Sequence, residues 1–223
     1  MTGALDLVDH APFFDRAAIL ADRPAPAIEE AYTKFYAACR HCHAPVDAFL
    51  AVMRDNRLSA GEVEAVSVGA YSGALRIANS PAPRNLVDAQ YSIPYCLGLA
   101  AIRGPAALLP MTETELGDAA AEGFARKVTL GIDPDCEARF PAETPVRVRV
   151  AARGTSFASA ITGPRGESSS PPSWEERLDK LRTASAARLG QVGQGEVLAA
   201  VAALKDGTLA PLRRLLAAPL AVR

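Results

Sequence analysis

Chemically reactive side chains concentrate in one short stretch, residues 34–49, with the sequence KFYAACRHCHAPVDAF. It holds two of the three histidines, two of the four cysteines and two cations: Lys34, Cys39, Arg40, His41, Cys42 and His43. A desolvated lysine or histidine shifts toward its neutral form and can then exchange a proton with substrate near pH 7. A helix that begins beside this cluster would add the positive end of its dipole. The stretch therefore predicts a site that binds an anion, such as a carboxylate, and moves protons.

The same residues match other patterns, which we weighed. Residues 39–43 fit C-x-x-C-H, the attachment pattern of c-type haem, but haem attachment accompanies export, and residues 1–10 have two acids and no basic residue. A thioredoxin-like C-x-x-C should follow a buried strand, and residues 32–38 are only weakly strand-like. The cysteines and histidines of this stretch are too crowded to surround one zinc ion. Cys96 and Cys136 stand alone and are typical of buried thiols. We predict no metal and no cofactor.

Composition excludes several classes of partner. The 24 basic and 25 acidic side chains nearly cancel, so no global field draws the chain to nucleic acid or to a membrane surface. Apolar stretches such as 96–109 are interrupted and fall short of the roughly 20 residues that span a bilayer. Neither a P-loop nor a G-x-S-x-G pattern occurs. With reduced thiols and no export signal, we predict a cytoplasmic protein.

Helical periodicity predicts the elements that position the cluster. Val46, Phe49, Leu50 and Met53 share one face, which predicts a helix from Pro45 to about Asn56 with Pro45 in its first turn. A second helix is expected over 85–102, bent at Pro94, and stopped by Gly104-Pro105. Further helices are expected over 13–20 and 114–122.

Alternating residues predict strands over 62–70, 128–132, 146–150 and 157–161, the last two joined at Arg153-Gly154. The fold class is therefore α+β with an antiparallel sheet. We divide the chain into a lead-in segment (1–33), an α+β domain (34–163) and a C-terminal helical segment (173–223), separated from the domain by a loop. Ser173 and Glu176 fit a capping box at the start of that segment, which is expected to contain further short helices over 195–204 and 209–217.

The chain resembles the MmgE/PrpD family, which includes 2-methylcitrate dehydratase, cis-aconitate decarboxylase and iminodisuccinate epimerase. Residues 34–48 fit its K-x-Y-x-x-C-R-x-x-H-x-x-x-D-A stretch and depart mainly at Ala37, where proline is common. Residues 89–95, AQYSIPY, resemble its A-[KQ]-[FY]-S-[LI]-P-Y segment. Residues 141–181 resemble its sheet and the entry to its terminal helices. The three blocks occur in the same order as in the family.

The resemblance implies specific site residues. Lys34 would anchor a substrate carboxylate or stabilise enolate charge, and His43 would donate, accept or orient a proton. Further substrate contacts would come from Arg40, His41, Ser92 and Tyr95. Family chemistry passes through carbanion character beside a carboxylate, so electrostatic stabilisation would be its largest contribution.

The resemblance also implies an active site at the seam with a large N-terminal helical domain, which this sequence does not contain. We therefore expect a C-terminal subunit of a split lyase or isomerase, acting on a small carboxylate by dehydration, decarboxylation, epimerisation or a repurposed cyclisation. Its partner would be a separate chain resembling the helical domain, in a hetero-oligomer. The alternative is a non-catalytic binding or regulatory subunit that retains the fold. The substrate and the reaction subtype stay open.

Overall fold

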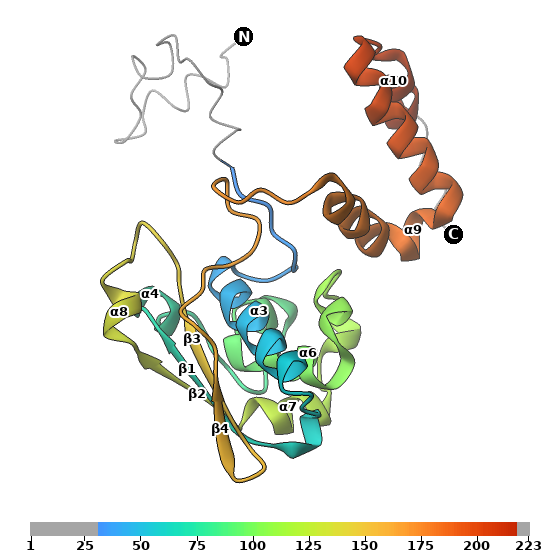
Figure 1. Ribbon diagram of the computed structural model, residues 1–223. Helices are drawn as coiled ribbons and strands as arrows, with labels where there is room; N and C mark the ends of the chain where they lie inside the picture. Colours follow the sequence, from blue (N-terminus) through green and yellow to red (C-terminus); the bar gives the residue numbers. More distant parts are fainter. Residues whose placement is uncertain (1–30, 218–223) are drawn as a thin grey trace, which may run out of the picture. The chain divides into compact units, whose positions relative to one another are not determined.

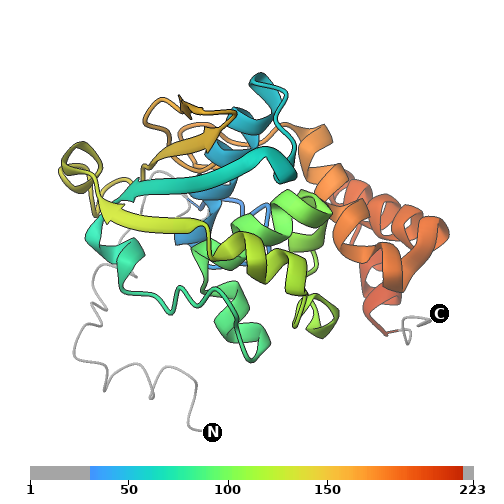
Figure 2. The ribbon, with the colours of Figure 1, turned by 90° about the horizontal axis from the view of Figure 1, so that it is seen from below.

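The computed structural model describes residues 31–217, whose centre is a four-stranded sheet with helices packed on one face (Figure 1). The strands are β1 (Val63–Ala70), β2 (Val128–Ile132), β3 (Arg147–Ala152) and β4 (Thr155–Ala158), in the order β2-β1-β3-β4. Helices α3 (Arg40–Asp55), α6 (Ile93–Arg103) and α7 (Ala119–Ala125) lie on the same side of the sheet (Figure 2). The predicted α+β class is confirmed.

The sheet is mixed rather than wholly antiparallel. β1 pairs antiparallel with β3, and β3 with β4, as expected, but β2 lies parallel to β1, with Val66 opposite Val128. Parallel neighbours need a long crossover connection, and the helices between β1 and β2 supply one. Strand periodicity in the sequence does not report this direction, because parallel and antiparallel strands alternate alike.

Alternation along the strands sets the two faces of the sheet. Val148 and Val150 of β3 are fully buried, whereas Arg149 between them is exposed. On β1, Val66 and Val68 are buried against the helices in the same way. The predicted strands are thus confirmed, with ends that differ by one to a few residues.

Helix α3 starts five residues before the predicted start. It begins at Arg40, with Cys39 as N-cap, so Pro45 lies inside the helix and the first-turn assignment was wrong. Proline lacks the N–H that would bond the carbonyl four residues earlier, but burial of Val46, Phe49 and Val52 outweighs this loss. The helix ends at Asp55, as predicted.

The helix expected over 85–102 is two helices, α5 (Leu86–Gln90) and α6, and the predicted bend at Pro94 was wrong. The chain breaks at Tyr91-Ser92, where the Ser92 hydroxyl accepts a hydrogen bond from the Tyr95 N–H at 3.1 Å. Pro94 falls in the first turn of α6, where a missing N–H costs nothing. Gly104 then ends α6 at φ 83°, as the sequence indicated.

The third predicted helix was misplaced. Residues 113–115 form a 3-10 turn, η4 (Glu113–Glu115), and α7 begins only after Asp118, whose carboxylate accepts hydrogen bonds from the N–H groups of Ala120 and Ala121. The remaining short helices and 3-10 turns of the domain are η2 (Ala60–Glu62), α4 (Ser72–Leu75), η3 (Pro105–Leu108) and α8 (Pro134–Glu137). The helix predicted over 13–20 lies outside the described residues.

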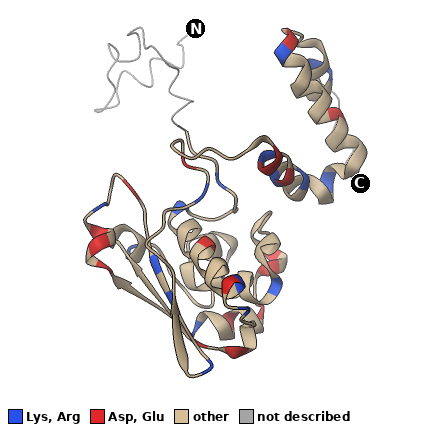
Figure 3. Cartoon of the chain, viewed as in Figure 1, with Lys and Arg blue, Asp and Glu red and all other residues tan. Residues whose placement is uncertain are grey.

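The C-terminal segment is helical, as predicted. Helix α9 (Trp174–Ala202) starts at the expected capping box of Ser173 and Glu176, and Gly190, at φ 58° and ψ −176°, divides it into two helices. A 3-10 turn, η5 (Ala203–Asp206), and helix α10 (Ala210–Ala217) follow. Basic and acidic residues are interspersed along α9 (Figure 3). In residues 31–217 we find no helix both long and apolar enough to cross a membrane.

Candidate functional site

The predicted site residues gather around the start of α3, and His43 is the most enclosed of them. Its side chain is only 1% exposed, and its ring lies 5.1 Å from that of Tyr36, between centroids. Within residues 31–217, the Nε2 atom of His43 is buried and has no hydrogen-bond partner. A buried polar atom without a partner is costly, and such exceptions concentrate at functional positions.

The pKa of His43 falls from 6.5 to about 4. Burial is the main cause, and the positive charge of Arg40 acts in the same direction; the charge of Asp47 and a backbone hydrogen bond at Ala38 oppose it. The positive charge of Lys34 also lowers the pKa, with the smallest effect of the five causes. His43 is therefore neutral at physiological pH, the form in which an imidazole can accept a proton.

Lys34 and Arg40 differ in how far they are engaged. Lys34 is exposed. Arg40 is nearly enclosed, with 11% of its side chain exposed, and it forms an ion pair with Glu167 and donates to the backbone carbonyl of Arg165 at 3.3 Å. Its guanidinium also stacks over the Tyr32 ring at 4.2 Å from the centroid. An incoming carboxylate would have to displace Glu167 to reach Arg40, whereas within residues 31–217 Lys34 has no ion pair.

His41 forms a separate pair with Tyr71. Its Nδ1 lies 2.7 Å from the Tyr71 hydroxyl, and the two rings meet edge to face. Burial lowers the pKa of His41, so this imidazole is also held toward its neutral form. Tyr71 in turn stacks on Phe140 with 4.6 Å between centroids. This pair fixes the orientation of the His41 ring.

The hydroxyl groups of Ser92 and Tyr95 form hydrogen bonds within the protein. Ser92 is fully buried, caps α6 and donates from its hydroxyl to the carbonyl of Ser80 at 2.5 Å. Tyr95 is also fully buried and donates to the backbone carbonyl of Glu115. Both hydroxyls are thus engaged within the protein, on α6 rather than at the start of α3. Their assignment as substrate contacts stays a prediction.

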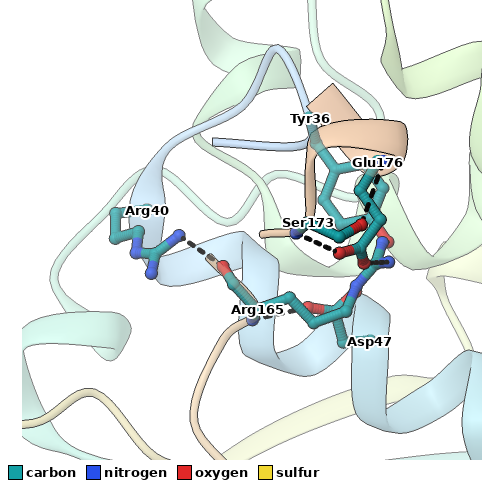
Figure 4. Close-up of polar contacts among 6 residues, drawn as sticks. All are labelled: Tyr36, Arg40, Asp47, Arg165, Ser173 and Glu176. Carbon is teal, nitrogen blue, oxygen red and sulfur yellow. Dashed lines mark hydrogen bonds and ion pairs between the residues drawn. The ribbon is translucent and has the colours of Figure 1, made fainter. Parts of the chain in front are cut away.

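A second polar network, which the sequence reading did not assign, ties α3 to the loop before α9 (Figure 4). Asp47 accepts hydrogen bonds from the Tyr36 hydroxyl at 2.7 Å, the Arg165 Nε at 3.0 Å and the Arg165 backbone N–H at 3.1 Å. Arg165 also reaches Glu176 of α9 at 4.0 Å. Tyr36 and Asp47 are the tyrosine and the aspartate of the K-x-Y-x-x-C-R-x-x-H-x-x-x-D-A stretch. Their fixed places in that pattern were the signal by which the sequence could have identified them. These two residues therefore act as an anchor for the loop.

The cysteines are arranged around the α3–α6 contact. Cys39 is the half-buried N-cap of α3, while Cys42 and Cys96 are fully buried. A hydrogen bond with Cys96, together with burial, raises the pKa of the Cys42 thiol, so Cys42 is held as a neutral thiol. The four cysteines are free, and residues 31–217 contain no group of three acidic, histidine or cysteine side chains placed to hold a metal ion.

One pocket that borders this network has a volume of about 710 Å³ and runs along α3 toward the segment 158–165. Tyr36, Asp47 and Arg165 contribute to its wall, together with Ala51, Asn56 and Ala160. Neither Lys34 nor His43 lines this pocket. The start of α3 therefore combines an exposed lysine with a buried histidine, outside this pocket.

The structure thus combines a sheet with helices on one face, a lysine–histidine stretch that leads into the first described helix, and terminal helices after a capping box. These are the features expected of the C-terminal domain that the sequence resembles. The family model for the MmgE/PrpD C-terminal domain matches residues 36–206. The chain belongs to the MmgE/PrpD family, as a C-terminal domain of it. The matched range includes His43 and begins two residues after Lys34. No curated protein matches the chain.

Proposed function

We propose that this domain supplies the lysine and histidine half of an active site for a lyase or isomerase reaction on a small carboxylate. A helical partner domain, on a separate chain, would supply the other half. The observation that supports this most is His43, whose neutral imidazole has a buried Nε2 without a partner in the described residues. Family membership supports the reaction class.

In this proposal Lys34 and His43 have different tasks. The exposed ammonium of Lys34 binds a substrate carboxylate or the charge that develops on an enolate, which is the interaction that lowers the barrier most. His43, which its lowered pKa keeps neutral, orients or transfers the proton at the adjacent carbon. For this, Tyr36 must move away from the ring, and docking of the partner is the event expected to move it.

The test uses the complex assembled with the helical partner, assayed with cis-aconitate, 2-methylcitrate and iminodisuccinate. Lys34→Ala and His43→Ala should each lower kcat/KM by about 100-fold or more, as expected for loss of one transition-state contact. Lys205→Ala is the matched control, because Lys205 is an exposed lysine of η5, and it should leave the rate unchanged. Wild-type rates in both site variants would show that these residues are not catalytic.

One observation favours a second candidate, a non-catalytic binding or regulatory subunit. His43 is covered by Tyr36, and Arg40 is already paired with Glu167, so two of the predicted groups are engaged within the chain. In that case the stretch 34–48 serves only as the anchor for the 163–167 loop. The complex would then keep its activity in Lys34→Ala and His43→Ala but lose assembly in Asp47→Ala, measured by size-exclusion chromatography.

A further inference from the structure

The pair formed by His41 and Tyr71 has a defined direction of hydrogen bonding. The Tyr71 side chain is 1% exposed, and burial raises the pKa of its hydroxyl, so the phenol keeps its proton. A buried phenol O–H needs an acceptor for its proton.

Among the described residues, the acceptor within reach is the Nδ1 atom of His41, at 2.7 Å. A neutral imidazole that accepts at Nδ1 has its proton on Nε2, because the two ring nitrogens have opposite roles. His41 is only half-buried, so its ring is not closed off from solvent or from a ligand.

We infer that Tyr71 holds His41 in the Nε2-protonated tautomer, so that His41 offers a neutral N–H donor to an anionic group of the substrate. Tyr71 is then a positioning residue, since it acts only through His41. That the anionic group is a substrate carboxylate rests on the proposed function. The assignment of the tautomer rests only on the contact between His41 and Tyr71.

Geometry supports a fixed donor rather than a freely turning ring. Tyr71 is clamped by its stacking on Phe140, with an interplanar angle of 13°, and it holds the His41 ring both at Nδ1 and edge to face. His41 is also on the first turn of α3, immediately after Arg40. A donor held in this way loses little rotational freedom when it binds a carboxylate, which is how preorganisation improves affinity.

Long-range ¹H–¹⁵N NMR of the ¹⁵N-labelled full chain tests the tautomer directly, with His41→Gln used to assign the signals. In the wild type we expect an unprotonated Nδ1 and a protonated Nε2. In Tyr71→Phe we expect the preference to be lost and both nitrogens to move toward averaged shifts. Tyr36→Phe is the control, because it removes another buried hydroxyl that bonds Asp47 rather than His41. A protonated Nδ1 in the wild type would overturn the inference without any variant.

The donor role is tested by adding succinate to the same sample, with sodium chloride at equal ionic strength as the control. Succinate should shift the His41 Nε2–H signals of the wild type and should bind about tenfold more weakly to Tyr71→Phe. An Nε2–H that does not respond to succinate would overturn the donor role. Neither NMR result depends on turnover. The NMR experiments can therefore contradict this inference independently of the activity assay with Lys34→Ala, which tests the proposed function.

Discussion

The residues of the candidate site occupy three distinct electrostatic states. Lys34 is an exposed cation, Arg40 is a cation already neutralised by Glu167, and His43 is a neutral ring removed from water. The sequence predicted which residue types gather at the start of α3, since all three lie within ten positions. It could not predict their states, because Glu167 reaches Arg40 from far along the chain, and the cover over His43 is a matter of packing.

The lowered pKa of His43 makes folding stability depend on pH. As the pH falls below 6.5, the histidine takes up a proton in the unfolded chain, but in the folded protein it does so only near pH 4. Its contribution to stability is therefore complete above pH 6.5 and is lost as the pH falls toward 4. The expected loss between pH 7.5 and pH 4 is about 3 kcal/mol in the free energy of unfolding.

His43→Gln provides the comparison for this prediction, because glutamine does not titrate. Urea unfolding of both proteins at several pH values gives the unfolding free energy of each. The value for the wild type minus that for His43→Gln should decrease as the pH falls, because only the wild type loses the contribution of His43. Effects of the carboxylates are common to both proteins and cancel in that difference. A difference that stays constant between pH 7.5 and pH 4 would contradict the lowered pKa.

At the scale of elements, α3 both presents the site and anchors the loop that follows β4. Asp47 lies one residue before the buried Ala48 on α3 and binds Arg165 through two separate bonds, while Thr33 donates its N–H to the Gly166 carbonyl at 2.8 Å. Gly166 has φ 83°, and a Cβ there would lie 2.3 Å from the Thr33 oxygen. The two ends of the α+β domain are therefore joined beside the start of α3.

Asp47→Asn should weaken this anchor measurably. The substitution removes the charge that receives the Tyr36 and Arg165 bonds, and bonds of this kind contribute about 1.5–3 kcal/mol. We expect a loss of about 2 kcal/mol in urea unfolding and faster proteolysis within residues 163–172. Asp55→Asn, at the exposed end of the same helix, is the control and should cost less than about 0.5 kcal/mol. Equal losses in the two variants would argue against the anchor.

Two helical glycines should respond to alanine in opposite ways. At Gly98 of α6 a Cβ would lie 2.3 Å from the backbone oxygen of Ala121 in α7, so Gly98→Ala should force the helices apart and cost about 3 kcal/mol. At Gly123 no atom lies within 4 Å of the position of a Cβ, and Gly123→Ala should stabilise α7 by about 0.5–1 kcal/mol. Thermal unfolding monitored by circular dichroism measures both; a neutral Gly98→Ala would show that α6 and α7 are less closely packed.

Elements that depend on local sequence patterns could be predicted, whereas those that depend on contacts between distant residues could not. Strand alternation and the capping box at Ser173 are local patterns, and the structure confirms both. The predicted start of α3 and the predicted bend at Pro94 were wrong because each depends on a competition between proline placement and burial, which a periodic pattern does not weigh. The parallel β1–β2 pairing and the Asp47–Arg165 anchor join distant parts of the chain, and no local pattern reports them.

For the whole molecule, the position of the reactive cluster is consistent with a site that another surface completes. The chain belongs to the MmgE/PrpD C-terminal domain family, and its lysine and histidine lie outside the pocket that borders the loop anchor. A site of this kind needs another surface to exclude water and hold the substrate, since electrostatic stabilisation is strongest where water is excluded. We propose that the helical partner provides that surface.

The most direct test of this account is a reconstitution assay with three samples: the chain alone, the helical partner alone, and the two together, each with cis-aconitate, 2-methylcitrate and iminodisuccinate. The account predicts turnover only in the mixture, with the rate saturating at a fixed molar ratio, and loss of that turnover when the chain is replaced by Lys34→Ala. Full activity of the isolated chain, or undiminished activity of the mixture containing Lys34→Ala, would contradict it.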